Sequence, residues 1–166
     1  KVIWSQILTK HHKLKETDKC IQVFGARTHR YDFGKSLSEA ELSKWESDND
    51  IALPTDLRTY FTECGNGGPG PCYGIKSLEQ LRPYPGSTPF PGAEAARDIA
   101  CKYKDVDDDD FWYESDKTWC VSDETLADLI PIIAYGCGDD YCIAARGPAT
   151  GQIILRTYDY GLFDYG

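Results

Sequence analysis

Apolar residues recur at helical spacing in the first half of the chain. Residues 38–41 read Ser-Glu-Ala-Glu, a capping box in which a Ser oxygen accepts from the third helical amide and a Glu reaches back to the Ser amide. Leu42 and Trp45 follow three positions apart. This pattern predicts a helix that begins after Ser38 and ends near residues 48–50, where polar residues cluster.

A second helix is predicted immediately afterwards. Its apolar stripe at positions i, i+3, i+4 and i+7 consists of Leu57, Tyr60, Phe61 and Cys64. Thr55 precedes the stripe as the expected N-cap, and Gly65 follows it as the expected left-handed C-cap.

Weaker patterns predict the remaining elements outside the last third. The spacing of Ile3, Trp4, Ile7 and Leu8 indicates a short N-terminal helix. Strands are expected at residues 21–24, 71–76 and 119–121. A second capping box at residues 77–80 predicts a short helical turn. Residues 83–92 are rich in Pro and Gly and read as a surface loop, and residues 93–103 as a helix.

The last third of the chain reads as β-structure. Apolar strands are predicted at residues 129–135, 141–145 and 152–158, and Gly-containing turns join them. Such a series implies an antiparallel meander. Helices followed by strands indicate an α+β fold, with helices packed against a twisted, largely antiparallel sheet.

Composition fits a single domain over residues 1–166. The chain is 41% hydrophobic and has a net charge of −9, so it can bury a core, and nucleic-acid binding, which needs a basic face, is disfavoured. No run of 18 apolar residues exists, so no membrane-spanning helix is expected. An acidic surface fits a basic protein partner, although solubility alone is the commoner cause of such charge.

Seven cysteines are spread along the chain at irregular spacings. A secreted disulfide scaffold favours an even count in a shorter chain. We therefore expect reduced, mostly buried thiols in a cytoplasmic protein.

The glycine-rich stretch CGNGGPG, residues 64–70, raises the question of phosphate binding. A phosphate cradle presents amides from a helix N-terminus, whereas these glycines follow a helix. No Gly-Lys-Ser/Thr sequence follows and no strand leads into the stretch. The residues are interpreted as a helix C-cap and turn.

No motif predicts catalysis or a resident metal. The acidic run of residues 105–110 lacks the Gly and Glu of an EF-hand loop. Cys137 and Cys142 form one C-x4-C pair without a second pair or nearby His. Nothing in the sequence requires Cys64 or Cys72 to act as a nucleophile with His29. We expect no catalytic residues, no metal and no cofactor.

Four segments in order resemble the SMI1/KNR4 family, also called the SUKH superfamily. They are the stretch from His29 through LSEAELSKWE, then IALPTDLRTYFTECGNGG, GPGPCYGIKSLEQL, and LADLIPIIAYGCGDDYCIAARGPATGQI. The resemblance covers roughly residues 29–156 and leaves residues 1–28 as an N-terminal extension. The positions that match the family pattern, interpreted as structural, are Trp45, Glu46, Leu53, Pro54, Gly65, Asn66, Gly67, Gly68, Gly136, Gly138, Gly147, Pro148 and Gly151.

The sequence departs from the family pattern in two places. Family members usually continue past the last strand into a helix, whereas RTYDYGLFDYG shows none. The acidic run at residues 105–110 is also outside the shared pattern.

The resemblance implies a single α+β domain without catalytic residues. Bacterial members are often immunity proteins that neutralise a cognate polymorphic toxin, frequently a nuclease, and fungal members are regulatory scaffolds. Our first hypothesis is a toxin-neutralising protein with a basic partner. Its expected contact residues are Asp107, Asp108, Asp109, Asp110, Phe111, Trp112, Tyr113 and Glu114.

Alternatives remain open at this point. Phe111 and Trp112 are equally well interpreted as core residues. A scaffold without a toxin partner is the second hypothesis, and an enzyme with a Cys or carboxylate site is a remote third. The sequence leaves the identity of the partner and the oligomeric state open.

Overall fold

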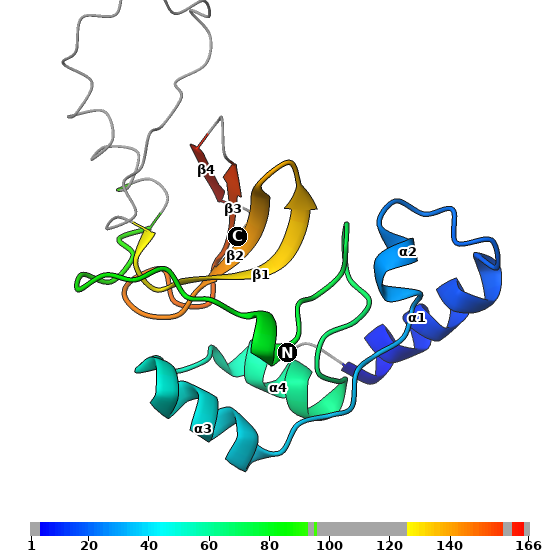
Figure 1. The fold of residues 1–166 in the computed structure, drawn as a ribbon, viewed down its shortest axis with the longest axis horizontal. Helices are drawn as coiled ribbons and strands as arrows, with labels where there is room; N and C mark the ends of the chain where they lie inside the picture. The colour runs from blue at the N-terminus through cyan, green and yellow to red at the C-terminus, as the bar shows by residue number, and fades with distance from the viewer. Residues whose placement is uncertain (1–3, 93–94, 96–125, 158–160, 165–166) are drawn as a thin grey trace, which may run out of the picture.

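A computed structural model of the chain describes residues 4–92, 95, 126–157 and 161–164. Its helices come first and its strands last (Figure 1). The helical elements are α1 (Trp4–Thr17), α2 (Ala26–His29), α3 (Glu39–Asn49), α4 (Thr55–Glu63) and a 3-10 turn, η1 (Leu78–Gln80). The strands are β1 (Leu129–Gly136), β2 (Asp139–Ala144), β3 (Ile153–Thr157) and β4 (Gly161–Asp164). The predicted α+β class is confirmed.

Helix α3 begins and ends as its sequence predicts. The Glu41 amide donates to Ser38 Oγ at 3.3 Å, and the Ser38 amide donates to the Glu41 carboxylate at 2.8 Å. This reciprocal pair satisfies two amides that the first helical turn leaves free. Asp50 ends the helix in a left-handed conformation, and Leu42 is fully buried.

Helix α4 buries the predicted stripe but has different caps from those expected. Pro54, not Thr55, is the N-cap, so the helix begins one residue earlier than predicted. Cys64 is the C-cap. Gly65 follows with a φ of 155°, far from the left-handed helical value of about 57°, because its amide still donates to the Tyr60 carbonyl.

The N-terminal segment differs most from expectation. Helix α1 is longer than the predicted short helix, and residues 21–24 form a turn, so the predicted strand there is wrong. The Asp18 carboxylate accepts from the amides of Gln22 and Val23, at 2.8 and 3.1 Å. Ile21 also has a positive φ of 51°. A side chain that bonds nearby amides in this way competes with extended structure.

The four strands form one antiparallel sheet in the order β1-β2-β3-β4. The predicted meander of β1, β2 and β3 is confirmed, and β4 adds an unpredicted fourth strand. Residues 71–76 do not form the predicted strand. Instead, the segment around Ile75 lies beside β1 and extends the hydrogen bonding of the sheet through isolated bridges. The Lys76 amide donates to Ile132 at 2.8 Å, and Ile75 exchanges hydrogen bonds with Gly68.

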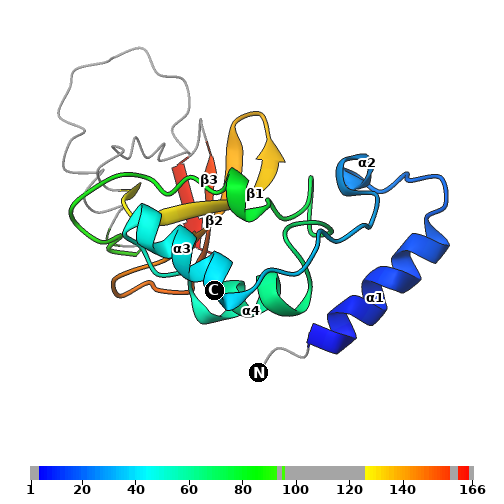
Figure 2. The ribbon, with the colours of Figure 1, turned by 60° about the horizontal axis from the view of Figure 1, so that its bottom comes forward.

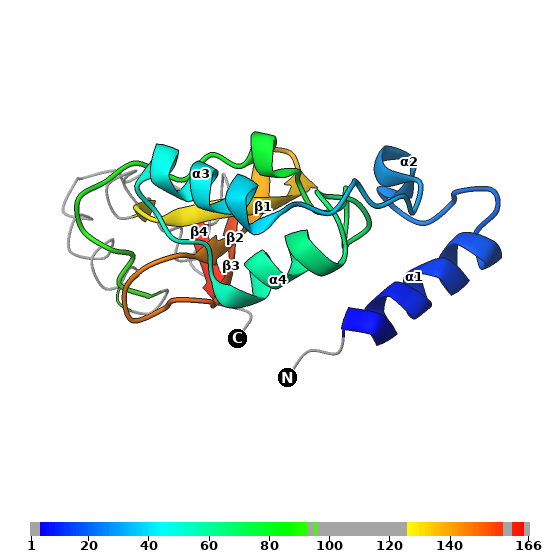
Figure 3. The ribbon, with the colours of Figure 1, turned by 90° about the horizontal axis from the view of Figure 1, so that it is seen from below.

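Both faces of the sheet are covered. On one face Ile130, Ile132 and Ile143 pack with the buried residues of α3 and α4. On the other face Leu129, Cys142 and Ile154 pack around Phe90, which is fully buried although it lies in the predicted surface loop. Figures 2 and 3 show α3 and α4 beside the sheet and α1 at the far end of the molecule.

Several predicted elements lie outside the described residues. They are the helix at residues 93–103, apart from Ala95, the acidic loop at 105–110 and the strand at 119–121. In the part of the chain that is described, no helix has the length and apolar character needed to cross a bilayer.

Candidate functional site

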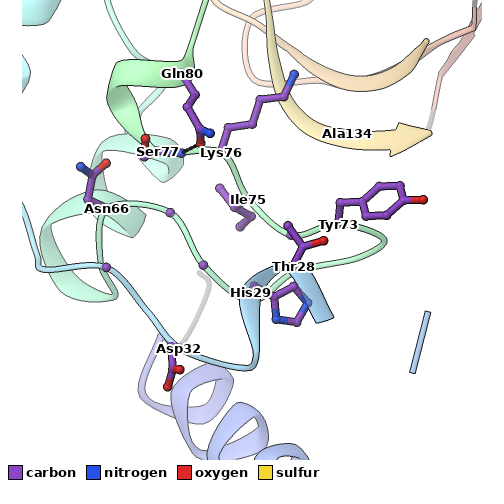
Figure 4. Close-up of a pocket in the computed structure, with 14 residues that line it drawn as sticks. Thr28, His29, Asp32, Asn66, Tyr73, Ile75, Lys76, Ser77, Gln80 and Ala134 are labelled. Carbon is purple, nitrogen blue, oxygen red and sulfur yellow. Dashed lines mark hydrogen bonds between the residues drawn. The ribbon is translucent and has the colours of Figure 1, made fainter. Parts of the chain in front are cut away.

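The glycine-rich stretch lines the first of two adjoining surface pockets. This pocket has a volume of about 410 Å³ and lies where the segment before α3, the loop after α4 and the segment before η1 meet (Figure 4). Its polar lining residues are Thr28, His29, Asp32, Asn66, Lys76, Ser77 and Gln80. A second pocket shares Thr28 and Tyr73 with it and is lined also by Val23, Phe24 and Arg27.

Close backbone approach explains the glycines of this loop. A Cβ on Gly34 would lie 2.2 Å from the carbonyl oxygen of Asn66, and a Cβ on Gly65 would lie 2.2 Å from that of Gly34. On Gly68 a Cβ would lie 2.7 Å from the Asp32 carbonyl oxygen. Three chain segments therefore pack backbone against backbone, which only residues without a Cβ permit.

Asn66 fastens the loop to η1. Its Nδ2 donates to both carboxylate oxygens of Glu79 at 3.0 Å, and its Oδ1 accepts from the Leu78 amide at 2.7 Å. Hydrogen bonds to the charged carboxylate, from the backbone and from Ser77 and Asn66, hold the pKa of Glu79 below its ordinary value. The side-chain amide of Asn66 is therefore engaged in hydrogen bonds within the protein.

The ionisable groups at the pocket are largely engaged. Lys76 Nζ donates to Asp140 at 2.7 Å, and Asp32 pairs with Lys15. His29 Nδ1 accepts from the Tyr31 amide at 3.1 Å. Burial lowers the pKa of His29, so the ring is neutral at pH 7.

Two of the described cysteines near the glycine loop, Cys64 and Cys72, lack the lowered pKa of an activated nucleophile. Cys64, the C-cap of α4, is buried, and burial raises its pKa; the same cause raises the pKa of Cys72. A nucleophilic thiol needs the opposite shift. Neither residue is among the described residues that line the pocket.

The C-x4-C pair is divided between two environments. Cys137 is exposed in the β1–β2 turn, whereas Cys142 is fully buried, and burial raises its pKa to about 12. The two thiols of this pair therefore lie in different environments, one at the surface and one in the core.

The other family-pattern residues occupy three separate places. At the α3–α4 junction, Glu46 accepts from the Leu53 amide at 2.8 Å and pairs with Arg58, while Trp45 packs against the core and Pro54 caps α4. Gly136 is the last residue of β1 and Gly138 lies in the β1–β2 turn, whereas the β2–β3 connection holds Gly147, Pro148 and Gly151. The eight expected contact residues from Asp107 to Glu114 lie outside the described residues.

Sequence reasoning missed an exposed apolar cluster and a division of charge. Val23, Phe24, Tyr73 and Tyr135 are exposed, at 54, 64, 38 and 43% of their surface. Residues 1–31 contain seven Lys and Arg residues and two Asp and Glu residues, whereas the remainder contains eleven basic and twenty-five acidic residues. Counting charge by segment finds the second feature, but no local pattern distinguishes the exposed aromatic residues from buried ones.

The fold and the site define an α+β protein whose glycine loop is a close-packed junction between chain segments. A model of the SMI1 / KNR4 family (SUKH-1) matches residues 36–163, and the chain belongs to this family. No curated protein and no solved structure matches the chain. The resemblance seen in the sequence is thereby confirmed.

Proposed function

We propose that this chain is a non-catalytic, cytoplasmic immunity protein that binds and neutralises a cognate bacterial toxin. The observation that carries the proposal is the family match over residues 36–163, because bacterial members of this family are often immunity proteins. The raised pKa values of the Cys64 and Cys72 thiols and the engaged polar groups of the glycine-loop pocket agree with a binding role.

The charge of the chain suggests the chemistry of the partner. A net charge of −9 favours a basic protein, and nuclease toxins are basic because they bind phosphate backbones. An acidic inhibitor accelerates encounter with such a partner by electrostatic steering. We propose that Asp107 to Asp110, with the neighbouring aromatic residues and Glu114, contact the toxin.

Co-purification tests the proposal first. The tagged chain is expressed in its native host and captured at low and at high salt, and the eluted proteins are identified. Stoichiometric recovery of a basic toxin domain, together with protection of cells that express this toxin, supports the proposal. If a toxin is encoded next to this gene and its product fails to bind the chain, the proposal is wrong for this pair.

Matched charge variants test the contact residues. Replacing Asp107, Asp108, Asp109 and Asp110 by Asn removes four charges, and so do Asn or Gln replacements of Asp48, Asp50, Asp56 and Glu63. Both variants lower the association rate at low salt through weaker steering. We expect the first to lower it at least several-fold further; equal rates contradict a local contact.

A further inference from the structure

Three of the five exposed large apolar side chains in the described part of the chain line the second pocket. Val23, Phe24 and Tyr73 are exposed at 54, 64 and 38% of their surface, and the rings of Phe24 and Tyr73 lie 5.3 Å apart. The pocket has a volume of about 410 Å³. Single exposed apolar residues are ordinary, whereas a group of them around a hollow is typical of a surface that binds another molecule.

Close backbone contact fixes the shape of the second pocket. Gly25, which joins Phe24 to α2, approaches the loop before Tyr73 so closely that a Cβ on it would lie 1.7 Å from the carbonyl oxygen of Cys72. Ala26 is fully buried, and its amide donates to the Val23 carbonyl at 3.0 Å. Figure 4 shows Tyr73 directed away from the glycine-loop pocket. The aromatic wall of the second pocket is therefore preorganised, which lowers the entropic cost of binding a ligand there.

The charge at the second pocket is positive. Arg27 lines the pocket and Arg30 follows three positions later, and both are exposed and form no ion pair with any described residue. No Asp or Glu is among the described residues that line the pocket. The carboxylate of Asp18, in the preceding turn, already accepts three hydrogen bonds. A ligand with carboxylates therefore meets unpaired guanidinium groups beside an apolar hollow.

We propose that the second pocket binds an acidic peptide segment of a partner protein. One large apolar side chain of the peptide enters the pocket between Phe24 and Tyr73, and neighbouring carboxylates of the peptide pair with Arg27 and Arg30. A planar guanidinium suits this role because it can hold a carboxylate through two parallel hydrogen bonds. The site is separate from the acidic residues proposed to contact a toxin, so the inference goes beyond the proposed function and does not depend on it.

The number of cations favours a peptide over a nucleic acid. A single strand carries a phosphate at every nucleotide and is held by a groove with many cations. Arg27 is the single cation among the described residues that line the pocket, and the net charge of −9 repels a long polyanion. A peptide with two or three carboxylates beside an apolar residue matches Arg27, Arg30 and the aromatic wall.

Selection from a random peptide library tests the chemistry of the occupant. Twelve-residue peptides displayed on phage are selected against the immobilised full chain, and peptides that also bind the Phe24→Ser variant are removed. We expect the enriched sequences to place a large apolar residue beside two or more Asp or Glu residues. Enrichment of basic or uncharged sequences, or no enrichment, overturns this proposal and leaves the proposed toxin binding standing.

Fluorescence anisotropy with an enriched peptide locates the site on the chain. We expect Phe24→Ser and Arg27→Glu each to weaken binding about tenfold or more, because the first removes the aromatic wall and the second repels carboxylates. Leu14→Ser and Lys35→Glu make the same kinds of change at exposed positions outside the pocket. These controls should alter the dissociation constant less than about twofold. Equal effects of a variant and its control overturn the assignment to this pocket.

Changes in the ligand test both halves of the proposed contact. Asn and Gln in place of the peptide's Asp and Glu should weaken binding and remove its dependence on salt between 20 and 500 mM. Ala in place of its apolar residue should weaken binding about tenfold. Vesicles of phosphatidylcholine and phosphatidylserine in a 3:1 ratio and a single-stranded thymidine 20-mer serve as alternative ligands. Tighter binding of either one, lost in both Phe24→Ser and Arg27→Glu, overturns the choice of a peptide.

Discussion

At the residue scale, two glycines separate the cost of backbone conformation from the cost of crowding. Gly74 and Gly151 have the same φ of 87°. A Cβ on Gly74 would lie 2.4 Å from the carbonyl oxygen of Gly68, whereas a Cβ on Gly151 would meet nothing within 4 Å. We expect Gly151→Ala to lower the free energy of unfolding by about 1 kcal/mol through left-handed strain alone.

The crowded position should be far less tolerant. Gly74→Ala introduces the same left-handed strain and also displaces the neighbouring backbone. We expect it to lower the free energy of unfolding by about 3 kcal/mol. Urea unfolding of the two variants measures the difference. Equal losses would mean that the contact between the Gly68 and Gly74 segments is loose in solution, which contradicts the close packing of the glycine loop.

Glu46 offers a second comparison between single residues. It accepts from the Leu53 amide and pairs with Arg58, and its side chain is only 17% exposed. Glu39 pairs with the same Arg58 but is 71% exposed. We expect Glu46→Ala to cost about 2 kcal/mol because a buried amide loses its acceptor, and Glu39→Ala about 0.5 kcal/mol or less. Unfolding by denaturant distinguishes them; similar costs would mean that the Leu53 amide finds another acceptor.

At the element scale, α1 is held to the rest of the molecule by few contacts. None of its described side chains is fully buried. Trp4 meets Tyr60 edge-on at 6.0 Å, Leu8 packs on the core, and His11 meets Phe33 at 5.5 Å. The Nδ1 atom of His11 is buried without a hydrogen-bond partner in the part of the chain that is described.

The pH dependence of this docking follows from His11. Burial, then the charges of His29 and His12, lower its pKa, so the docked state disfavours the protonated ring. The undocked or unfolded chain binds a proton near pH 6.5, and stability therefore rises with pH. The stabilising contribution is present above about pH 6.5 and is lost as pH falls below it.

Trp4 fluorescence and unfolding between pH 7.5 and 5 measure the release of α1. His11→Gln should flatten this dependence, whereas His12→Gln, at an exposed position, should leave most of it. Carboxylates held by hydrogen bonds, such as Glu41, lose their contribution only at lower pH, because their pKa is lowered. A pH response unchanged by His11→Gln would place its origin elsewhere.

The elements that sequence reasoning found are those whose signal is local. Capping side chains and an unbroken apolar stripe define α3 and α4 within a few residues, and turn glycines separate β1, β2 and β3. The turn at Asp18 was missed because a single carboxylate overrides the β preference of Ile21 and Val23. Phe90 was assigned to the surface because its burial depends on β1–β3, more than thirty residues away in the sequence.

At the scale of the whole molecule, the basic N-terminal segment should oppose the proposed basic partner. Lys10, Lys13 and Lys19 are exposed and form no ion pair within the described residues. Replacing all three by Gln makes the net charge more negative and leaves the exposed apolar residues Val23, Phe24, Tyr73 and Tyr135 unchanged. Stronger attraction should raise the association rate with a basic toxin domain about two- to fivefold at low salt.

Salt dependence identifies the cause of this change. The rates of the triple variant and the wild-type chain should converge at 0.5 M salt, where charges more than about 4 Å apart are screened. Stopped-flow measurements at several salt concentrations provide the comparison. Slower association of the triple variant would instead show that these lysines face carboxylates of the partner. The N-terminal segment would then be part of the binding surface, and the partner's contact face would be acidic where it meets α1.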